Sequence, residues 1–258
     1  AISELQKTEL VDEHRICKAE KVNVIPLGFD LSRFQDDREK KRALFRHVYG
    51  IAADEIAIGI VGRLVPIKNH DLFIDVIARM ERRTGKKVRA FVVGDGEERE
   101  RLQQSVQEMG LSQVNGPYFN GHGFGHGVNG KPAVDRASIT FTSWIKEVDI
   151  VTAGLDIMML TSLNEGTPVS LIEAQAANLP VISTNVGGIE NVVVQGKTGF
   201  LHDSGDANGL TDSLLQLVED EGLRKRMAAE GWDHVREKYH YTRLVADTAR
   251  MYDTLLNN

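Results

Sequence analysis

Two glutamates, Glu165 and Glu173, stand in the stretch of the sequence with the most informative chemistry, residues 156–174. The apolar run at its start predicts a buried strand, which leads through a turn into a helix. Glu165 falls in the turn, and Glu173 lies roughly 7 to 8 Å along the predicted helix from Pro168. The spacing alone is equally compatible with two surface glutamates beside an ordinary helix.

The start of this helix predicts a site for an anion. Thr167 is the predicted N-cap and Pro168 the predicted first helical residue, where its missing N–H loses no hydrogen bond. The amides of Val169 and Ser170 would then point outward without partners, at the positive end of the helix dipole. A diphosphate suits that position. The two glutamates would repel phosphate, so they suit hydroxyl-rich groups on either side of it, a sugar by the first and a ribose by the second.

Residues 59–69 form a second predicted strand-to-helix turn. Arg63 can fork onto phosphate oxygens, and Lys68 can supply a second point charge. Two cations in a glycine-containing turn indicate an anion pocket in a chain whose net charge is −6. Taken alone, they are also compatible with a solvated turn.

Glycines mark two further turns after predicted strands. Gly94 and Gly96 precede a charged helix, in a turn of the kind that lines a ligand crevice. Gly187 and Gly188 permit a close approach of the backbone, although a purely structural turn is the simpler interpretation of this pair.

These turns need a framework, and the apolar pattern supplies one. Short apolar runs alternate with amphipathic segments, and several runs are apolar at consecutive positions, as in parallel strands covered on both faces. The predicted strands are residues 22–25, 56–61, 88–93, 139–141, 156–160, 181–183 and 200–201. The predicted helices are residues 70–83, 97–109, 146–153, 168–177, 208–218, 222–239 and 242–255. The alternation predicts a Rossmann-like, doubly wound α/β fold, a parallel sheet with helices on both faces.

Residues 112–137 fit this framework poorly, because they hold too many glycines for a stable helix or strand. We predict a glycine-rich surface insertion. His122 and His126 within it suggest a metal site, but two histidines without nearby carboxylates or thiolates do not complete a ligand set. We therefore expect no metal.

Composition excludes several classes of protein. With 31 basic and 37 acidic side chains, the chain lacks the basic balance of a nucleic-acid binder. The single cysteine, Cys17, excludes an internal disulfide framework and fits a reducing compartment. No apolar stretch approaches the roughly 18 to 20 residues of a membrane span, and no secretory signal precedes the first predicted elements. We expect a cytoplasmic domain spanning residues 1–258, cut from a longer protein.

Taken together, these segments resemble the retaining GT-B glycosyltransferases of family GT4, also called glycosyl transferase group 1. The family's E-x7-E motif corresponds to Glu165 and Glu173, its G-R-L-x-x-x-K-N stretch to residues 62–69, and its V-I-P-x-G-x-D segment to residues 24–30. Further matches occur in register at residues 94–96, 179–182, 187–188 and 196–200. The order and spacing of these matches over nearly the whole chain make the resemblance specific. One departure is Ser143, which stands where the family often has the glycine of F-x-G.

The resemblance implies a role for each matching position. Arg63 and Lys68 would bind the donor diphosphate and stabilise negative charge on the leaving nucleotide, and Glu165 would lie beside the donor sugar; these are the expected catalytic residues. Glu173 would bind the ribose hydroxyls, and the amides of residues 166–170 would hold sugar hydroxyls and phosphate. The full expected donor-binding set is Gly62, Gly94, Ile145, Gly166, Thr167, Pro168, Val169, Ser170 and Glu173. Such enzymes usually need no metal, because cationic side chains and a helix dipole replace it.

The resemblance covers the C-terminal, donor-binding half of a GT-B enzyme. It implies that residues 1–20 and 240–258 pack toward a missing N-terminal domain, which would bind most of the acceptor. The full-length protein would then be cytoplasmic, with peripheral association at the inner face of the membrane as an open alternative.

We therefore expect the donor domain of a retaining transferase that moves a hexose from a nucleoside-diphosphate sugar to a glycan, lipid or other hydroxyl acceptor. UDP is favoured only because it is the commonest donor nucleotide of the family. Without the other half, the fragment should bind the donor and not transfer it. The alternatives are a sugar-nucleotide epimerase of the same architecture and a nucleotide-sugar-binding module without turnover.

Overall fold

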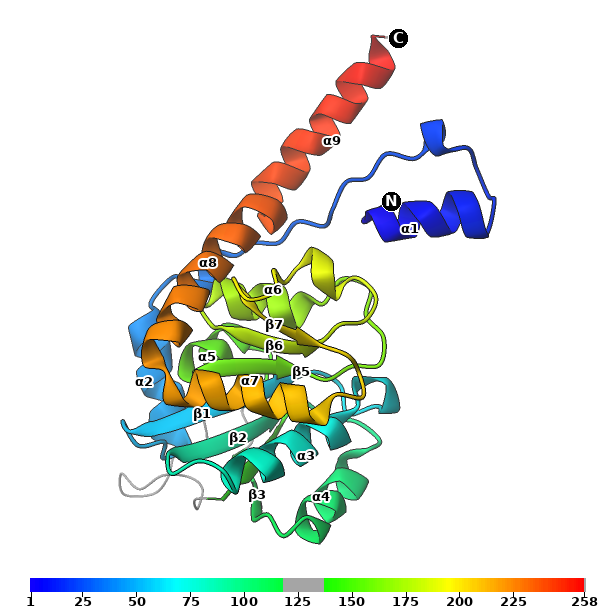
Figure 1. Cartoon of the computed structure of the whole chain (residues 1–258). Coiled ribbons are helices and arrows are strands. Elements are labelled where there is room, and N and C mark those ends of the chain that lie inside the picture. Colours follow the sequence, from blue (N-terminus) through cyan, green and yellow to red (C-terminus); the bar gives the residue numbers. More distant parts are fainter. Residues whose placement is uncertain (118–136, 258) are drawn as a thin grey trace.

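The structure, a computed structural model, describes residues 1–117 and 137–257, and its centre is a sheet of parallel strands (Figure 1). The strand order is β3-β4-β2-β1-β5-β6-β7. The strands are β1 (Glu55–Val61), β2 (Lys87–Val93), β3 (Gln113–Asn115), β4 (Ile139–Ser143), β5 (Ile157–Leu160), β6 (Val181–Thr184) and β7 (Gly199–His202). Every ladder between them is parallel, so all of the strands end at the same edge of the sheet.

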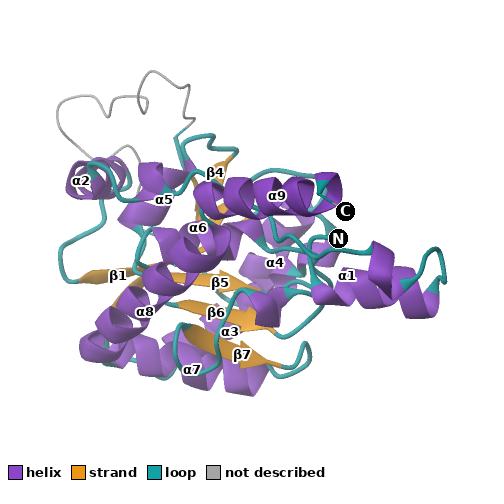
Figure 2. Ribbon diagram, turned by 90° about the horizontal axis from the view of Figure 1, so that it is seen from above, coloured by secondary structure: helices purple, strands orange, loops and turns teal. Residues whose placement is uncertain are grey.

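Helices cover both faces of this sheet (Figure 2). The helices that cover it are α2 (Arg38–Val48), α3 (His70–Glu81), α4 (Arg99–Glu108), α5 (Val148–Gly154), α6 (Val169–Ala176), α7 (Ala207–Glu219) and α8 (Glu221–Tyr239). Helices α1 (Glu4–Thr8) and α9 (Tyr241–Leu256) lie away from the sheet (Figure 1). The predicted fold class, a Rossmann-like doubly wound α/β sheet with helices on both faces, is confirmed.

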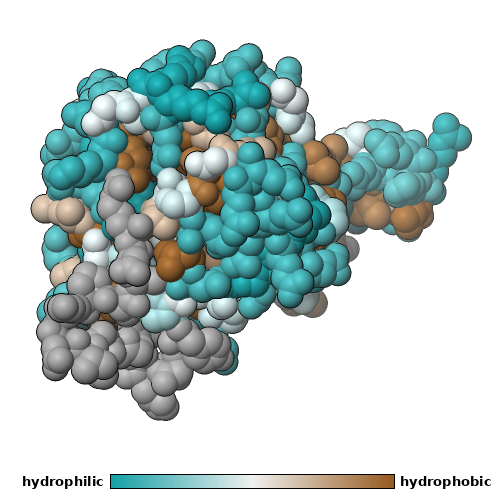
Figure 3. All heavy atoms as spheres, turned by 90° about the horizontal axis from the view of Figure 1, so that it is seen from below, coloured by the Kyte–Doolittle hydropathy of each residue, from teal (hydrophilic) through white to brown (hydrophobic). Residues whose placement is uncertain are grey.

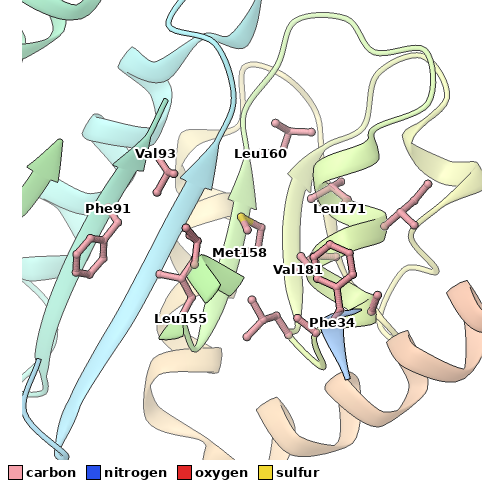
Figure 4. Packing of buried hydrophobic residues seen from close by; sticks show 14 of the residues in the cluster. Phe34, Phe91, Val93, Leu155, Met158, Leu160, Leu171 and Val181 are labelled. Carbon is pink, nitrogen blue, oxygen red and sulfur yellow. The ribbon is translucent and has the colours of Figure 1, made fainter. Parts of the chain in front are cut away.

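Two hydrophobic clusters, one on each face, hold the layers together. Helices α2, α5, α6 and α8 contribute to the first cluster, part of which is shown in Figure 4, and α3, α4 and α7 contribute to the second. In β2, Phe91 and Val93 belong to the first cluster, while Ala90 and Val92 belong to the second. Successive strand residues point to opposite faces, so a strand covered on both sides must be apolar at consecutive positions. This is why the apolar runs located the strands.

The chain leaves β1 in two directions. It first builds β2, β4 and β3 on one side, and later β5, β6 and β7 on the other. The carboxyl ends of β1 and β5 therefore flank the point at which the strand order reverses, which is where open α/β sheets bind ligands.

Three predictions about the elements are wrong. Residues 22–25 are not a strand, because they lie beside no sheet edge; the Ile25 amide donates to the Ala1 carbonyl instead, at 2.8 Å. The insertion begins with a short strand, β3, since Gln113–Asn115 pairs with β4 at the edge of the sheet. Helix α2 was not predicted, because charged residues dominate its sequence and hide the apolar side formed by Phe45 and Val48. Residues 118–136 of the insertion, with His122 and His126, lie outside the described residues.

Helix α9 has no buried residue, a property that it shares only with the short helix α1 among the α-helices of the described residues. It extends away from the sheet (Figure 1), with Val245, Tyr252 and Leu255 all more than half exposed. Its first turn is fixed to the body, because Arg243 donates to the carbonyl of Pro26 at 2.8 Å. The packing of residues 1–20 and 240–258 against another domain stays a prediction.

One face of the molecule is largely hydrophilic (Figure 3). Figure 3 shows a face on which apolar side chains form separated patches among hydrophilic ones. None of the helices in the described part of the chain combines the length and the apolar character that a bilayer crossing requires.

Candidate functional site

One cavity of about 390 Å³, here called the carboxyl-end cavity, gathers loops from the carboxyl ends of four strands. The loops after β1 and β5 face each other across it, and those after β2 and β4 close one side. It is lined by Val61, Gly62, Arg63, Lys68, Val93, Gly94, Trp144, Ile145, Val148, Glu165, Thr167, Pro168, Val169, Ser170 and Glu173. Every predicted site residue is in this set except Gly166. That residue lines an adjoining cavity of about 280 Å³, which Thr167 also contacts.

An ion pair that the sequence did not predict joins two of the loops. Lys68 Nζ lies 2.5 Å from Glu165 Oε1, and Ser162 Oγ donates to the same oxygen at 2.6 Å. Thr161 Oγ1 reinforces the contact by donating to the carbonyl of Asn69 at 2.9 Å. The Glu165 carboxylate is thus held in place, and the charge of Lys68 is partly neutralised.

Arg63 contrasts with this lysine. Its side chain is exposed and, among the residues that the structure describes, makes no hydrogen bond or ion pair. A guanidinium presents donors in a fork that matches two phosphate oxygens. Arg63 is therefore the cation of this cavity that is available to an anion.

The start of helix α6 corrects one prediction. Pro168 occupies the N-cap position with φ −75° and ψ 85°, and the helix begins at Val169. Thr167 is therefore not the N-cap, because the non-helical ψ of Pro168 delays the first helical residue by one position. No side chain caps the helix, and the Pro168 carbonyl accepts from the Leu171 amide at 3.0 Å. Within the described residues, the amides of Val169 and Ser170 have no partner, so an anion-binding helix start is retained.

Glycines are required where these loops touch. A Cβ atom on Gly94, whose φ is +146°, would lie 1.9 Å from the carbonyl oxygen of Gly62. Likewise, a Cβ on Gly187 would lie 2.0 Å from the Glu165 oxygen, and one on Gly188 would lie 1.9 Å from the Gly166 oxygen. The Gly187-Gly188 pair, a weak signal in the sequence, therefore lets the turn after β6 press against the loop that carries Glu165.

Glu173 lies in an environment that favours its neutral form. Burial raises the pKa of its carboxyl to about 7, Arg33 opposes this change, and the negative charge of Asp149 adds to it. Arg33 is itself paired with Asp149, at 2.7 Å, so its positive charge is largely compensated. A carboxyl with this pKa can accept hydrogen bonds from hydroxyl groups when ionised and can donate one when neutral.

Four lining residues were absent from the predicted set: Val61, Val93, Trp144 and Val148. Trp144 is the most informative of these, because its ring is 54% exposed and directly follows β4. The preceding Ser143 has φ +62°, a left-handed conformation that glycine adopts more easily. The Ser143 carbonyl accepts from the Gly94 amide at 3.0 Å.

No set of three or more metal-ligating side chains gathers among the residues for which the structure gives positions. The carboxyl-end cavity instead combines a free guanidinium, a paired lysine, free helix amides and two carboxylates. That arrangement suits an anion flanked by hydroxyl groups.

Comparisons with known proteins agree with this geometry. The curated relatives include a D-inositol 3-phosphate glycosyltransferase of Corynebacterium urealyticum, 26% identical over 91% of this chain and 51% of its own length. They also include the capsular polysaccharide biosynthesis glycosyltransferase CapM of Staphylococcus aureus, 25% identical over 99% of this chain and 61% of its own length. The chain spans about half the length of two Corynebacterium D-inositol 3-phosphate glycosyltransferases that it matches.

Among solved structures, Anabaena HepE in complex with UDP has the same fold, with a TM-score of 0.78 at 21% identity. The match covers 100% of this chain and 63% of HepE. The sequence pattern of the family described as glycosyl transferases group 1 matches residues 41–116 and 135–233. Because that match takes in well over half of the chain and includes the loops of the carboxyl-end cavity, the chain belongs to the glycosyl transferase group 1 family.

Proposed function

We propose that this chain is the donor-binding half of a retaining glycosyltransferase, which transfers a hexose from a nucleoside-diphosphate sugar to a hydroxyl acceptor. The observation that carries the proposal is the carboxyl-end cavity, where Arg63 and the free amides of α6 converge between two carboxylates. A diphosphate between hydroxyl-rich groups is the ligand that this order of charges fits best. UDP is the proposed nucleotide, and the UDP complex of the structurally similar HepE supports it.

The proposed donor lies along the cavity in a fixed order. The diphosphate contacts Arg63 and the α6 amides, and the ribose contacts Glu173. The sugar lies by Glu165 and Gly166, and the base lies toward Gly94 and Ile145, with the half-exposed Trp144 beside it. The order follows from charge, because the carboxylates flank the phosphates without contacting them.

The proposed chemistry is electrostatic. As the bond between the sugar and the phosphate breaks, negative charge grows on the leaving nucleotide, and Arg63, Lys68 and the helix dipole stabilise it. Glu165 is held by Lys68 and Ser162, so it is placed to orient the sugar rather than to attack it. Retention then follows if the acceptor oxygen bonds to the anomeric carbon on the face that the phosphate leaves. The acceptor proton passes to a phosphate oxygen. We propose that no metal takes part.

The acceptor, the N-terminal domain and the location in the cell are also proposals. An N-terminal domain would bind the acceptor, which is a glycan, a lipid or another hydroxyl compound, and would pack against residues 1–20 and 240–258. A location in the cytoplasm or at the inner face of the membrane fits such a transferase. The chain by itself would bind the donor without transferring it.

Calorimetry with UDP, GDP and ADP tests the donor site. We expect UDP to bind, and Arg63→Ala to weaken its binding by about 1.5 to 3 kcal/mol, the loss expected for a charged hydrogen bond. Lys40→Ala removes a cation whose side chain is 84% exposed, so it serves as the control. The proposal fails if none of the three nucleotides binds at millimolar concentration, or if both variants bind UDP as the unmodified chain does.

Two further measurements test the ribose assignment and the type of reaction. Glu173→Ala should weaken UDP more than pyrophosphate, and equal losses would remove the ribose assignment. In a protein that spans both halves, a transferase should release nucleotide only when acceptor is present, whereas an epimerase should convert the sugar nucleotide into its epimer without acceptor and without net release of nucleotide.

A further inference from the structure

A second cavity, of about 530 Å³, is here called the amino-end cavity. It is formed by the residues that precede β5 and β6, the first turns of α2 and the first half of α8. Figure 1 shows α2 and the start of α8 at the end of the sheet where the strands begin. The loops that hold Arg63 and Glu165 lie at the other end, so the two cavities are separate.

Cations outnumber carboxylates in its lining. The charged lining residues are Arg38, Arg42, Arg224 and Lys225 against Asp156, Glu221 and Asp233. This excess is notable in a chain whose net charge is −6.

The most enclosed of these carboxylates, Asp156, already has several partners. Its two oxygens accept from Arg42 at 2.7 Å and from Arg46 at 3.1 Å, and one also accepts from the Ala57 amide at 2.8 Å. One carboxylate therefore compensates two guanidinium groups and also accepts from a backbone amide.

The other two carboxylates are also occupied. Glu221 pairs with Lys225 at 2.6 Å, and Asp233 pairs with Arg236 at 3.1 Å. The acidic groups of the lining thus have partners of their own.

Among the described residues, two of the lining cations have no carboxylate partner: Arg224, which donates to the carbonyls of Leu217 and Val218, and Arg38. Arg38 is the less satisfied of the two. Its Nε is buried without a hydrogen-bond partner, and among the described residues its guanidinium forms no ion pair. Burial lowers the pKa of Arg38, and Arg42, one helical turn away, lowers it further. An anion beside Arg38 would remove both penalties, because it would supply the hydrogen bonds and the opposite charge.

We propose that the amino-end cavity binds a phosphate-bearing small molecule, with Arg38 as its principal ligand and Arg224 and Lys225 close by. A phosphate group carries the charge and the paired oxygens that a guanidinium fork accepts. The cavity is larger than phosphate alone requires and falls within the range of small-molecule sites. Its remaining wall is apolar, with Leu179, Pro180 and Trp232, so it has room for an organic part.

The two tryptophans of the chain make this proposal testable, because Trp144 lines the carboxyl-end cavity and Trp232 lines the amino-end cavity. Fluorine NMR of the chain labelled with 5-fluorotryptophan therefore reports on each cavity separately. We expect inorganic phosphate, added at constant ionic strength, to shift the Trp232 signal in a saturable way. Arg38→Gln should weaken this response at least about tenfold, and Arg38→Lys, which keeps the charge, should weaken it less.

Lys40→Gln is the matched control, since it removes one positive charge from the same helix outside the cavity. A UDP-induced shift of Trp144 that persists in Arg38→Gln would show that the variant is folded. The proposal is overturned if phosphate leaves the Trp232 signal unmoved at millimolar concentration. It is equally overturned if Arg38→Gln and Lys40→Gln weaken the response alike, because that pattern indicates general charge screening.

Discussion

The two cavities at opposite ends of the sheet both hold an arginine that forms no ion pair with any described residue, but they are built from different material. At the carboxyl end, glycine turns bring the backbone of four loops together, and free helix amides contribute to the site. At the amino end, the charged groups are side chains of α2 and α8 together with Asp156, which directly precedes β5. The difference follows from the parallel sheet, which gathers its strand-to-helix loops at one edge only.

The comparison teaches that backbone packing forms one site and side-chain pairing forms the other. The carboxyl-end cavity should therefore be sensitive to small changes at its glycines. The amino-end cavity should depend on which ion pairs are made.

The largest effect is expected at Gly94. Gly94→Ala forces a Cβ to 1.9 Å from the Gly62 oxygen and strains a positive φ. We expect about 3 kcal/mol or more to be lost from the free energy of unfolding, together with UDP binding. Gly110→Ala is the control, because Gly110 also has a positive φ, +77°, but open space around it. It should lose about 1 to 2 kcal/mol. For each variant, urea unfolding measures the free energy of unfolding and calorimetry measures UDP binding. Equal losses in the two variants would show that close backbone packing does not form the cavity.

The next effect concerns the ion pair of the carboxyl-end cavity. Lys68→Ala should weaken UDP binding by about 2 to 3 kcal/mol, because it removes a cation and leaves Glu165 unpaired near the phosphates. Adding Glu165→Gln should recover about 1 kcal/mol, measured as a double-mutant cycle by calorimetry. Arg38→Gln should leave UDP affinity unchanged. A loss of UDP affinity in this variant would show that the two cavities are energetically coupled.

The matching prediction for the amino-end cavity concerns the ion pairs of Asp156. Asp156→Asn leaves Arg42 and Arg46 without their shared carboxylate. We expect the free energy of unfolding to fall by about 2 kcal/mol, less than for a fully buried pair because the group is 18% exposed. Thermal unfolding tests this, with Asp233→Asn, at an exposed pair, as the control that should change it by less than about 0.5 kcal/mol.

The raised pKa of Glu173 predicts a smaller, pH-dependent effect on the free energy of unfolding. Since its pKa is raised to about 7 in the folded chain, the neutral form stabilises the fold at low pH. That contribution is lost as the pH rises through 7. Between pH 5 and 8 we expect the chain to lose about 1 to 2 kcal/mol of unfolding free energy relative to Glu173→Gln, after allowance for partial exposure. Denaturation at several pH values measures the difference, and parallel curves would contradict the assignment.

Removal of metal should have the smallest effect. Both cavities present cations of the protein to an anion, so EDTA should leave UDP affinity in calorimetry unchanged. A loss that Mg²⁺ restores would show that the donor diphosphate is bound through a metal.

Much of the fold was predictable because its signals are local. Consecutive apolar residues located the main strands, and glycine or proline turns located the loops at their ends. The failures have equally local causes. Residues 22–25 have the composition of a strand but no neighbour to pair with, α2 is hidden by charge, and Pro168 shifts the start of α6 by one residue.

By itself, the sequence determined the family resemblance, the alternation of strands and helices and the residues that meet in the carboxyl-end cavity. Glu165 and Glu173 could be placed because their spacing lies within one turn and one helix, where the backbone fixes geometry. The roles proposed for these residues stay predictions. Only the tertiary structure decided that Lys68 pairs with Glu165, that Gly187 and Gly188 press on the loop beside them, and that an unpaired Arg38 faces a second cavity. Those contacts join segments far apart in the chain, and their distances depend on strand order and close packing, which no spacing along the sequence specifies.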